Sequence, residues 1–248
     1  MKSNERVVTQ AEENALRRQF DEALKHLLLD RAKYEATKEF LQVEVINPHQ
    51  ESRARDLAEE RRLEIQGIYL ARGFSTPIPK PEVSNREFER RRTNNQELFF
   101  RHATAQVGYT AFMTAVDQSE HWTVKDEAER AKIVWEDAEQ GYWFWAEVPA
   151  NCPRLATTWN DLSGSIRLLS LEEYVIVWWM NKSLIGLKLD VPTWCWLRTR
   201  YKSDVGLGAL SADECDGRVY VGWSVPQDLA VPHGYFGGRA SEVVKTAA

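Results

Sequence analysis

The sequence predicts an α+β protein. A helical N-terminal region, residues 1–141, is followed by a C-terminal domain, residues 142–248, with a small, mostly antiparallel sheet. Apolar residues recur at three- and four-residue steps in the first half, which is typical of amphipathic helices. Aromatic and β-branched residues alternate with polar ones near the C-terminus, which is typical of strands. Eight of the ten tryptophans follow residue 142, and this asymmetry indicates two regions with different roles.

The first predicted helix covers residues 4–41, and Asn47-Pro48 ends the pattern because proline lacks a backbone N–H. Its apolar face is formed by residues at helical spacing: Leu16, Phe20, Leu24, Leu28 and Phe40. Such a face needs a partner, either other helices of this chain or a second copy, so self-association through these helices is one interpretation. A second helix is expected over residues 51–72. The proline-rich stretch Ser75–Pro81 then forms an extended connector, which is either a domain boundary or a long loop.

Two further helices are predicted before residue 142. Residues 85–116 include the basic run Arg90–Arg92, which could contact phosphate, but neighbouring glutamates dilute its charge and favour a solvated helix face. Residues 123–141 carry a capping pair, Thr123 and Asp126, and Gly141 suits the end of that helix. We interpret this region as a scaffold or oligomerisation element of about four helices.

The character of the sequence changes at residue 142. Residues 142–148 have the aromatic and β-branched content of a strand. Turn-forming residues mark the following segment as irregular, and its triplet Trp159-Asn160-Asp161 is interpreted as a turn. Ser170 and Glu173 then have the spacing of a capping box. The helix they begin has a strongly apolar face and is expected to end near Gly186.

Two strands are predicted over residues 193–201 and 218–224. In the first strand the tryptophans and arginines at even positions share one face, so each strand is expected to have one buried and one available face. The segments 202–217 and 226–236 are predicted to be loops, long for a plain hairpin. Long loops on a rigid base commonly carry binding sites.

Composition argues against several classes of protein. The 248-residue chain is 43% hydrophobic and 28% charged, as in globular rather than disordered proteins. A net charge of −5 and a pI near 5.7 give no electrostatic reason to expect nucleic acid or an anionic membrane as a partner. No apolar run approaches the ~20 residues of a membrane span, and the N-terminus lacks the apolar core of a signal peptide. The cytoplasm is therefore the default compartment.

No motif indicates a cofactor, a metal or a catalytic residue. Cys152, Cys195 and Cys215 lack C-x-x-C spacing and are interpreted as thiols in a reducing compartment. The five histidines show no metal-ligand spacing, and no phosphate-binding or nucleophile motif occurs. The acidic residues between positions 213 and 216 could hold a cation loosely, but in a solvated turn they need no ion. We therefore predict neither a cofactor nor a metal site.

The order of elements after residue 142 resembles the C-type lectin-like fold. It comprises a strand, a Trp-rich helix, a W-x-W-L strand at 194–197, a V-x-V-x-W strand at 219–223 and a closing Gly237-Gly238-Arg239-Ala240 segment. Within this fold the pattern is most similar to the formylglycine-generating-enzyme branch. There it resembles the variable proteins of diversity-generating retroelements, which end in a short G-x-R strand. The resemblance covers roughly residues 142–244 and says nothing firm about residues 1–141.

The resemblance implies a non-catalytic ligand-binding protein. In that family a reverse transcriptase with an adenine-mutating template diversifies surface residues, and the product binds other molecules, here an unknown protein or other macromolecule. Arginine and tyrosine suit such a surface because they offer large contact area at low entropic cost. The matching positions expected to be exposed are Arg198, Arg200, Tyr201, Asp204, Tyr220, Ser224, Gln227, His233, Tyr235 and Phe236. The positions assigned to the scaffold are Trp194, Val219, Val221, Trp223 and Arg239.

Two alternatives remain open. The branch also contains oxidising enzymes that hold copper with a cysteine pair in this region. Cys195 and Cys215 are the only candidates by position, but their surroundings do not match the family pattern. The other alternative is a phage or mobile-element structural protein, in which the helices assemble and the β-rich part decorates the assembly.

Overall fold

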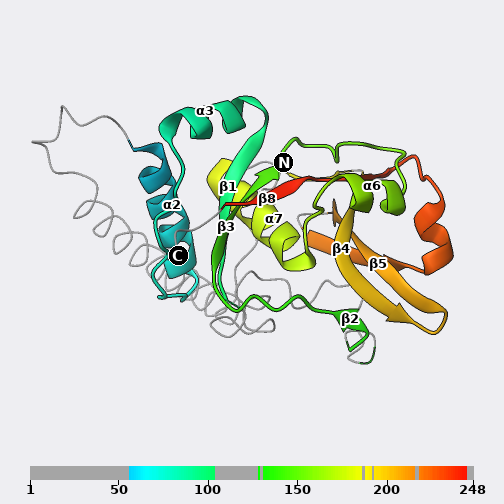
Figure 1. Cartoon of the computed structure of the whole chain (residues 1–248). Helices are drawn as coiled ribbons and strands as arrows, with labels where there is room; N and C mark the ends of the chain where they lie inside the picture. Colours follow the sequence, from blue (N-terminus) through cyan, green and yellow to red (C-terminus); the bar gives the residue numbers. More distant parts are fainter. Residues whose placement is uncertain are drawn as a thin grey trace, which may run out of the picture. The chain divides into compact units, whose positions relative to one another are not determined.

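A computed structural model describes most of the second compact unit of the chain, Ala54–Ala248 (Figure 1). The described residues are 56–103, 128, 131–185, 188–191, 193–215 and 218–244. The predicted helix over residues 4–41 lies outside them, and so does the interpretation of self-association through that helix. None of the helices in the described ranges is long and apolar enough to cross a membrane.

The described part of the N-terminal region contains a strand as well as helices. Helix α2, Leu57–Ala71, confirms the helix expected over residues 51–72. Helix α3, Asn85–Thr93, is shorter than predicted, because Asn94 caps it and Asn95 takes a left-handed conformation with φ of 56°. Strand β1, Gln96–Arg101, follows at once, so the helix predicted over residues 85–116 is wrong for this stretch.

The helix predicted over residues 123–141 is wrong for its described C-terminal part. Residues 131–141 contain the short strand β2, Ile133–Val134, and otherwise irregular chain. Strand β2 pairs antiparallel with β4, Trp194–Ser203, and the amide of Lys202 also donates to the carbonyl of Lys132 at 2.8 Å. The helical spacing of apolar residues here is overridden by pairing with a strand that lies far away in the sequence.

The first sheet joins segments from both sides of the predicted domain boundary. Its order is β1-β3-β8, where β3 is Tyr142–Glu147 and β8 is Ser241–Val243, and both pairs are antiparallel. Phe99 lies opposite Phe144 in β1 and β3. Since one sheet contains residues 96–101 and 142–147, a boundary at residues 141/142 does not separate two compact units.

The second sheet has five strands. Strand β4 pairs with β5, Gly206–Cys215, and β5 pairs with β6, Arg218–Ser224. Strand β7, Phe236–Gly238, runs parallel to the first residues of β4. The loop predicted over residues 202–217 is wrong for its described part, residues 202–215, because β4 continues to Ser203 and a tight turn leads directly into β5.

Helix α7, Leu171–Ile185, contacts both sheets, through β1 on one side and β4 and β5 on the other (Figure 1). Residues 174–181 are all buried, so the helix is covered on every side rather than on the single face expected. The predicted capping box is confirmed. The Ser170 hydroxyl accepts from the Glu173 amide at 3.2 Å, and the Glu173 carboxylate accepts from the Ser170 amide at 3.0 Å.

A smaller apolar cluster covers part of the other face of the second sheet. Helix α6, Trp159–Ser165, and the 3-10 helix η1, Pro226–Ala230, contact each other, and their Leu162 and Leu229 pack with Trp196 of β4. The turn predicted at residues 159–161 is therefore wrong, since this triplet begins α6. The Thr158 hydroxyl caps the helix by accepting from the Asp161 amide at 3.0 Å.

Candidate functional site

Arg198, one of the ten predicted ligand-binding residues, is part of an internal ion-pair network. Its guanidinium donates to the Glu136 carboxylate at 2.9 and 2.6 Å, to the buried carboxylate of Glu173, and to the Leu168 carbonyl at 2.7 Å. The pairing of β4 with β5 shifts register between Trp196 and Arg200, which interrupts the simple alternation of faces in this part of β4. The expectation of an outward-facing Arg198 is therefore wrong.

Tyr201 and Trp223 have the opposite exposures to those expected. Tyr201 is 1% exposed and stacks on the Trp223 ring, with centroids 4.9 Å apart and an interplanar angle of 11°. Trp223, which was assigned to the scaffold, is 47% exposed. Tyr201 lies directly opposite Gly208, and the absence of a side chain there lets the tyrosine ring reach across β5 to β6. Tyr201 thus supports the surface, and Trp223 forms part of it.

Four other predicted residues are accessible but do not share one surface with the rest. Arg200 lies over the Trp159 ring at 4.3 Å and donates to the Gly208 and Leu207 carbonyls at 2.7 and 2.6 Å. Asp204 is in the β4–β5 turn, Ser224 pairs with Ala209 at the end of β6, and Gln227 lies in η1. They surround the hairpin end of the sheet rather than its open face.

The remaining four residues lie at the opposite end of the second sheet, around a row of side chains that crosses four strands. Phe236 lies opposite Trp194 in the β7–β4 pair, and Asp213 lies opposite Tyr220 in the β5–β6 pair. Strands β4 and β5 are antiparallel, and Cys195 lies opposite Ala212. Trp194, one residue before Cys195, therefore lies opposite Asp213, one residue after Ala212. Cross-strand neighbours project from the same face of a sheet. We call Phe236, Trp194, Asp213 and Tyr220 the aromatic row.

The aromatic row is partly exposed and has a flat aromatic end. The Trp194 and Phe236 rings stack at 5.8 Å with an interplanar angle of 13°, and His233 lies 5.4 Å from the Phe236 ring. Tyr235, beside Phe236, is 71% exposed. Gly222 allows the Trp194 ring to lie across the sheet, because a β-carbon at this position would come within 3.2 Å of that ring.

Asp213 is the only charged member of the row. It is half-buried, and its Oδ1 atom has no hydrogen-bond partner within the described part of the chain. Burial and the negative charge of Asp190 raise the pKa of Asp213 to about 6. The sequence placed this residue in a solvated turn, whereas the structure places it inside β5. A carboxylate in this environment favours a ligand that donates hydrogen bonds or carries positive charge.

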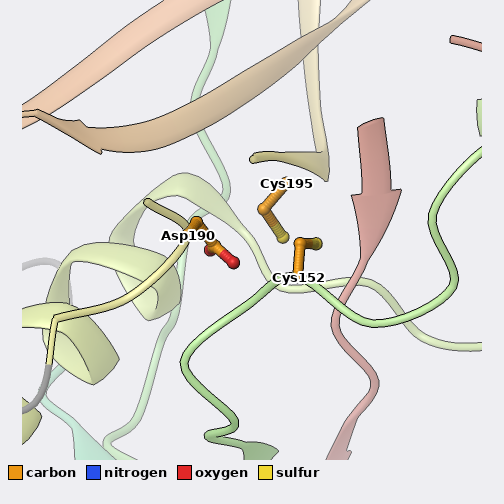
Figure 2. Close-up of side chains that lie close together, drawn as sticks. All are labelled: Cys152, Asp190 and Cys195. Atoms are coloured by element: carbon orange, nitrogen blue, oxygen red, sulfur yellow. The ribbon is translucent and has the colours of Figure 1, made fainter. Parts of the chain in front are cut away.

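A second constellation, Cys152, Asp190 and Cys195, is buried in the core (Figure 2). One ligand atom from each of the three side chains lies within 4.8 Å of the others. The Cys152 amide donates to the Thr193 hydroxyl at 3.0 Å. Asp190 has a left-handed backbone with φ of 59°, and its amide donates to the Ala150 carbonyl at 2.7 Å. Backbone contacts therefore position the two loop residues of the cluster.

Arg239 completes the charge balance of this cluster. Its guanidinium is fully buried and donates to both carboxylate oxygens of Asp190, at 3.0 and 2.5 Å. It also donates to the Glu147 and Pro149 carbonyls at 3.0 and 2.7 Å, so its predicted scaffold role is confirmed. Burial raises the pKa of the Cys152 thiol, and the neighbouring Cys195 and Asp190 act in the same direction.

The sequence did not reveal the proximity of Cys152 and Cys195. It singled out Cys195 and Cys215 by their position near the C-terminus, but Cys215 is exposed at the end of β5 and Cys195 is buried in β4. Cys152 lies in the loop after β3. No spacing rule connects the two buried cysteines, because the contact is made by tertiary packing alone.

The structure agrees with the predicted α+β class, since helices accompany two largely antiparallel sheets. No protein-family model matches this chain, and comparisons with curated proteins and with solved structures found no similar protein. The resemblance to C-type lectin-like variable proteins therefore stays a prediction.

Proposed function

We propose that this protein is a non-catalytic ligand-binding protein that uses the aromatic row, together with the exposed Tyr235 and His233. The observation that carries this proposal is Asp213, a half-buried carboxylate with an unpartnered Oδ1 atom among the described residues, flanked by aromatic side chains. The row belongs to a paired sheet, so its backbone is held in place before a ligand arrives.

The chemistry of the aromatic row favours a ligand with positive charge and apolar groups. Burial raises the pKa of Asp213, and a positively charged ligand group beside this carboxylate would stabilise its ionised form. Trp194, Phe236 and Tyr220 offer flat rings that lose little conformational entropy on binding and attract cations through their faces. A peptide segment with Lys or Arg beside apolar residues satisfies both requirements.

The sharper form of the proposal is that a retroelement diversifies this surface. The support comes from the resemblance, and four of the residues it implies lie in or beside the aromatic row: Tyr220, His233, Tyr235 and Phe236. Sequencing the DNA downstream of the gene should then reveal a near-copy of the codons for residues 194–239. The two copies should differ at adenines, and a reverse transcriptase gene should lie nearby. If no such copy exists, the diversified form is rejected and the binding module alone is retained.

Selection from a random peptide library on the immobilised full-length chain tests the binding proposal. We expect enriched peptides to contain Lys or Arg next to apolar residues. Asp213→Asn and Tyr220→Ala should each weaken binding of an enriched peptide by at least about tenfold. Val205→Ser, in the exposed β4–β5 turn outside the aromatic row, is the matched control and should leave the affinity unchanged.

Two outcomes would contradict the proposal. In the first, the library yields no peptide that binds the folded chain. In the second, enriched peptides bind the Asp213→Asn and Tyr220→Ala variants as tightly as the parent chain, which would place the binding surface elsewhere.

A further inference from the structure

We propose that Cys152, Asp190 and Cys195 form a site for a thiophilic divalent cation of the Zn²⁺ type. Its three residues are buried, whereas the aromatic row is partly exposed, and the neighbouring residues Trp194 and Cys195 project to opposite faces of β4. Figure 2 shows the three side chains together, from the loop after β3, the segment after α7 and strand β4. Two thiolates and a carboxylate are a donor set that Zn²⁺ accepts in proteins.

The separation of the donor atoms is compatible with one shared ion. The two sulfur atoms and a carboxylate oxygen lie within 4.8 Å of one another. Zn–S bonds of about 2.3 Å and tetrahedral angles place two sulfur ligands about 3.8 Å apart. The limit of 4.8 Å lies only about 1 Å above this spacing.

The charges of the cluster remain balanced when the ion binds. The Asp190 carboxylate and the Arg239 guanidinium already form a neutral buried pair. Binding of a divalent cation releases the two thiol protons of Cys152 and Cys195 to solvent, so the added charge of +2 is offset by two thiolates. Arg239 uses one lone pair of each Asp190 oxygen, which leaves another available for the metal and fixes the orientation of the carboxylate.

A buried hydroxyl group lies beside these donors. The Tyr174 hydroxyl of α7 is buried and faces the Asp190 carboxylate closely enough for each group to shift the pKa of the other. Buried hydroxyls usually have a partner. Tyr174 therefore helps, together with Arg239, to hold the Asp190 carboxylate in the cluster.

Elemental analysis of the purified full-length chain, produced in zinc-supplemented medium, tests the proposal. We expect about one Zn²⁺ per chain in the parent protein and in Cys215→Ser, which changes the exposed third cysteine. Cys152→Ser and Cys195→Ser should each retain less than about a tenth of that amount. Circular dichroism establishes that the variants are folded.

Refolding the parent protein with Co²⁺ in place of Zn²⁺ supplies a second measurement that needs no variant. A thiolate-to-cobalt charge-transfer band and visible bands of tetrahedral Co²⁺ are the expected result. These readouts do not depend on peptide binding, so the metal site and the proposed ligand-binding function fail or succeed separately.

Three results would overturn the inference. The first is a parent protein that holds no zinc after purification and gives no thiolate–cobalt band after refolding. The second is zinc that persists in both serine variants of the buried cysteines. The third is a denatured chain with one titratable thiol instead of three, which would show that at least one of the two buried cysteines is held in a disulfide.

Discussion

At the scale of single residues, Glu173 connects several segments of the fold. Its buried carboxylate accepts from the Arg167 guanidinium at 2.6 and 3.2 Å, from the Tyr142 hydroxyl at 2.7 Å, and from Arg198 and the Ser170 amide. Burial by itself raises the pKa of Glu173, but the charges of Arg198 and Arg167 outweigh it and lower the pKa to about 2. The carboxylate is therefore charged in the folded protein down to acidic pH.

Replacing Glu173 should reduce stability in a pH-dependent way. The pKa of Glu173 is lower in the folded state than its ordinary value of 4.5, so its stabilisation is complete above that value and disappears as the pH falls towards 2. Glu173→Gln should lower the free energy of unfolding by about 3 kcal/mol at pH 7 and by about half of that at pH 3. Urea denaturation at the two pH values measures this, with the half-exposed Glu87→Gln as control. Equal losses at both pH values would show that charge is not the cause.

Asp213 shows the opposite shift, and its titration can be observed directly. The pKa of Asp213 is about 6 in the folded chain against an ordinary value of 3.8, so the folded state holds this proton more tightly. Asp213 should therefore oppose folding increasingly as the pH rises from 4 to 6, and Asp213→Asn should remove that dependence. Carbon NMR of the carboxyl group is expected to give a midpoint near 6. Binding of a cationic peptide should weaken between pH 7 and pH 5, whereas a midpoint near 3.8 would contradict the environment described for this group.

At the scale of elements, β7 approaches the loop after β3 closely. The amide of Gly238 donates to the Pro153 carbonyl at 2.9 Å. A β-carbon on Gly237 would come within 2.3 Å of that carbonyl oxygen and 3.2 Å of the Cys152 sulfur. The glycine in the closing segment is thus required by backbone contact with this loop, a physical reason that holds whatever family the chain belongs to.

Gly237→Ala should therefore destabilise the fold. Because backbone atoms cannot move aside as a flexible side chain does, we expect a loss of about 1–3 kcal/mol in the free energy of unfolding. Gly234→Ala is the matched control, since nothing lies within 4 Å of its added β-carbon, and it should change stability by less than about 0.5 kcal/mol. Denaturant titration of both variants gives the comparison. Similar losses in the free energy of unfolding for the two variants would show that β7 can move away from the Pro153 carbonyl at little cost.

At the scale of the whole compact unit, the last described residues link the two sheets. Strand β7 pairs with β4 of the second sheet, and β8 pairs with β3 of the first. Arg239 lies between these strands and is held by Asp190 and by the Glu147 and Pro149 carbonyls. One buried guanidinium therefore connects the end of the chain to β3 and to the segment after α7.

Loss of Arg239 should affect the unit more than loss of a comparable arginine nearer to solvent. Arg239→Met leaves the Asp190 carboxylate buried and unpaired, for which we expect a cost of about 3–5 kcal/mol. Arg154→Met removes a pair with Glu147 whose arginine side chain is 35% exposed, and should cost less than about 1 kcal/mol. Adding Asp190→Asn to Arg239→Met should recover part of the loss. Thermal and chemical unfolding test this order, and equal effects of the two arginine variants would contradict it.

Local signals in the sequence predicted several elements correctly. The helix over residues 57–71, the strand at 142–147, the capped helix at 171–185 and the strand at 218–224 agree with capping residues, apolar runs and alternation. Strands β1 and β2 were missed because their pairing partners are distant in the sequence. Strand β5 was missed although its partners β4 and β6 are its sequence neighbours, because its glycines and acidic residues are typical of a loop. Helix α6 was missed because a run of turn-forming residues concealed its cap at Thr158.

Local patterns in the sequence were sufficient to predict the α+β class and helix α7 with its capping box, but not the burial of that helix on every side. Tertiary structure alone decided which side chains face outward. Arg198 lies beside a register shift in β4 and is paired with internal carboxylates instead of facing solvent. Tyr201 is covered by the Trp223 ring, and it is the tryptophan that is exposed. It also decided that Cys152, Asp190 and Cys195 meet, because these residues lie on three segments that only packing brings together. The alternation of residues determines on which face of its own strand a side chain lies. The residues that it contacts are determined by strand register and by the packing of segments that are distant in the sequence.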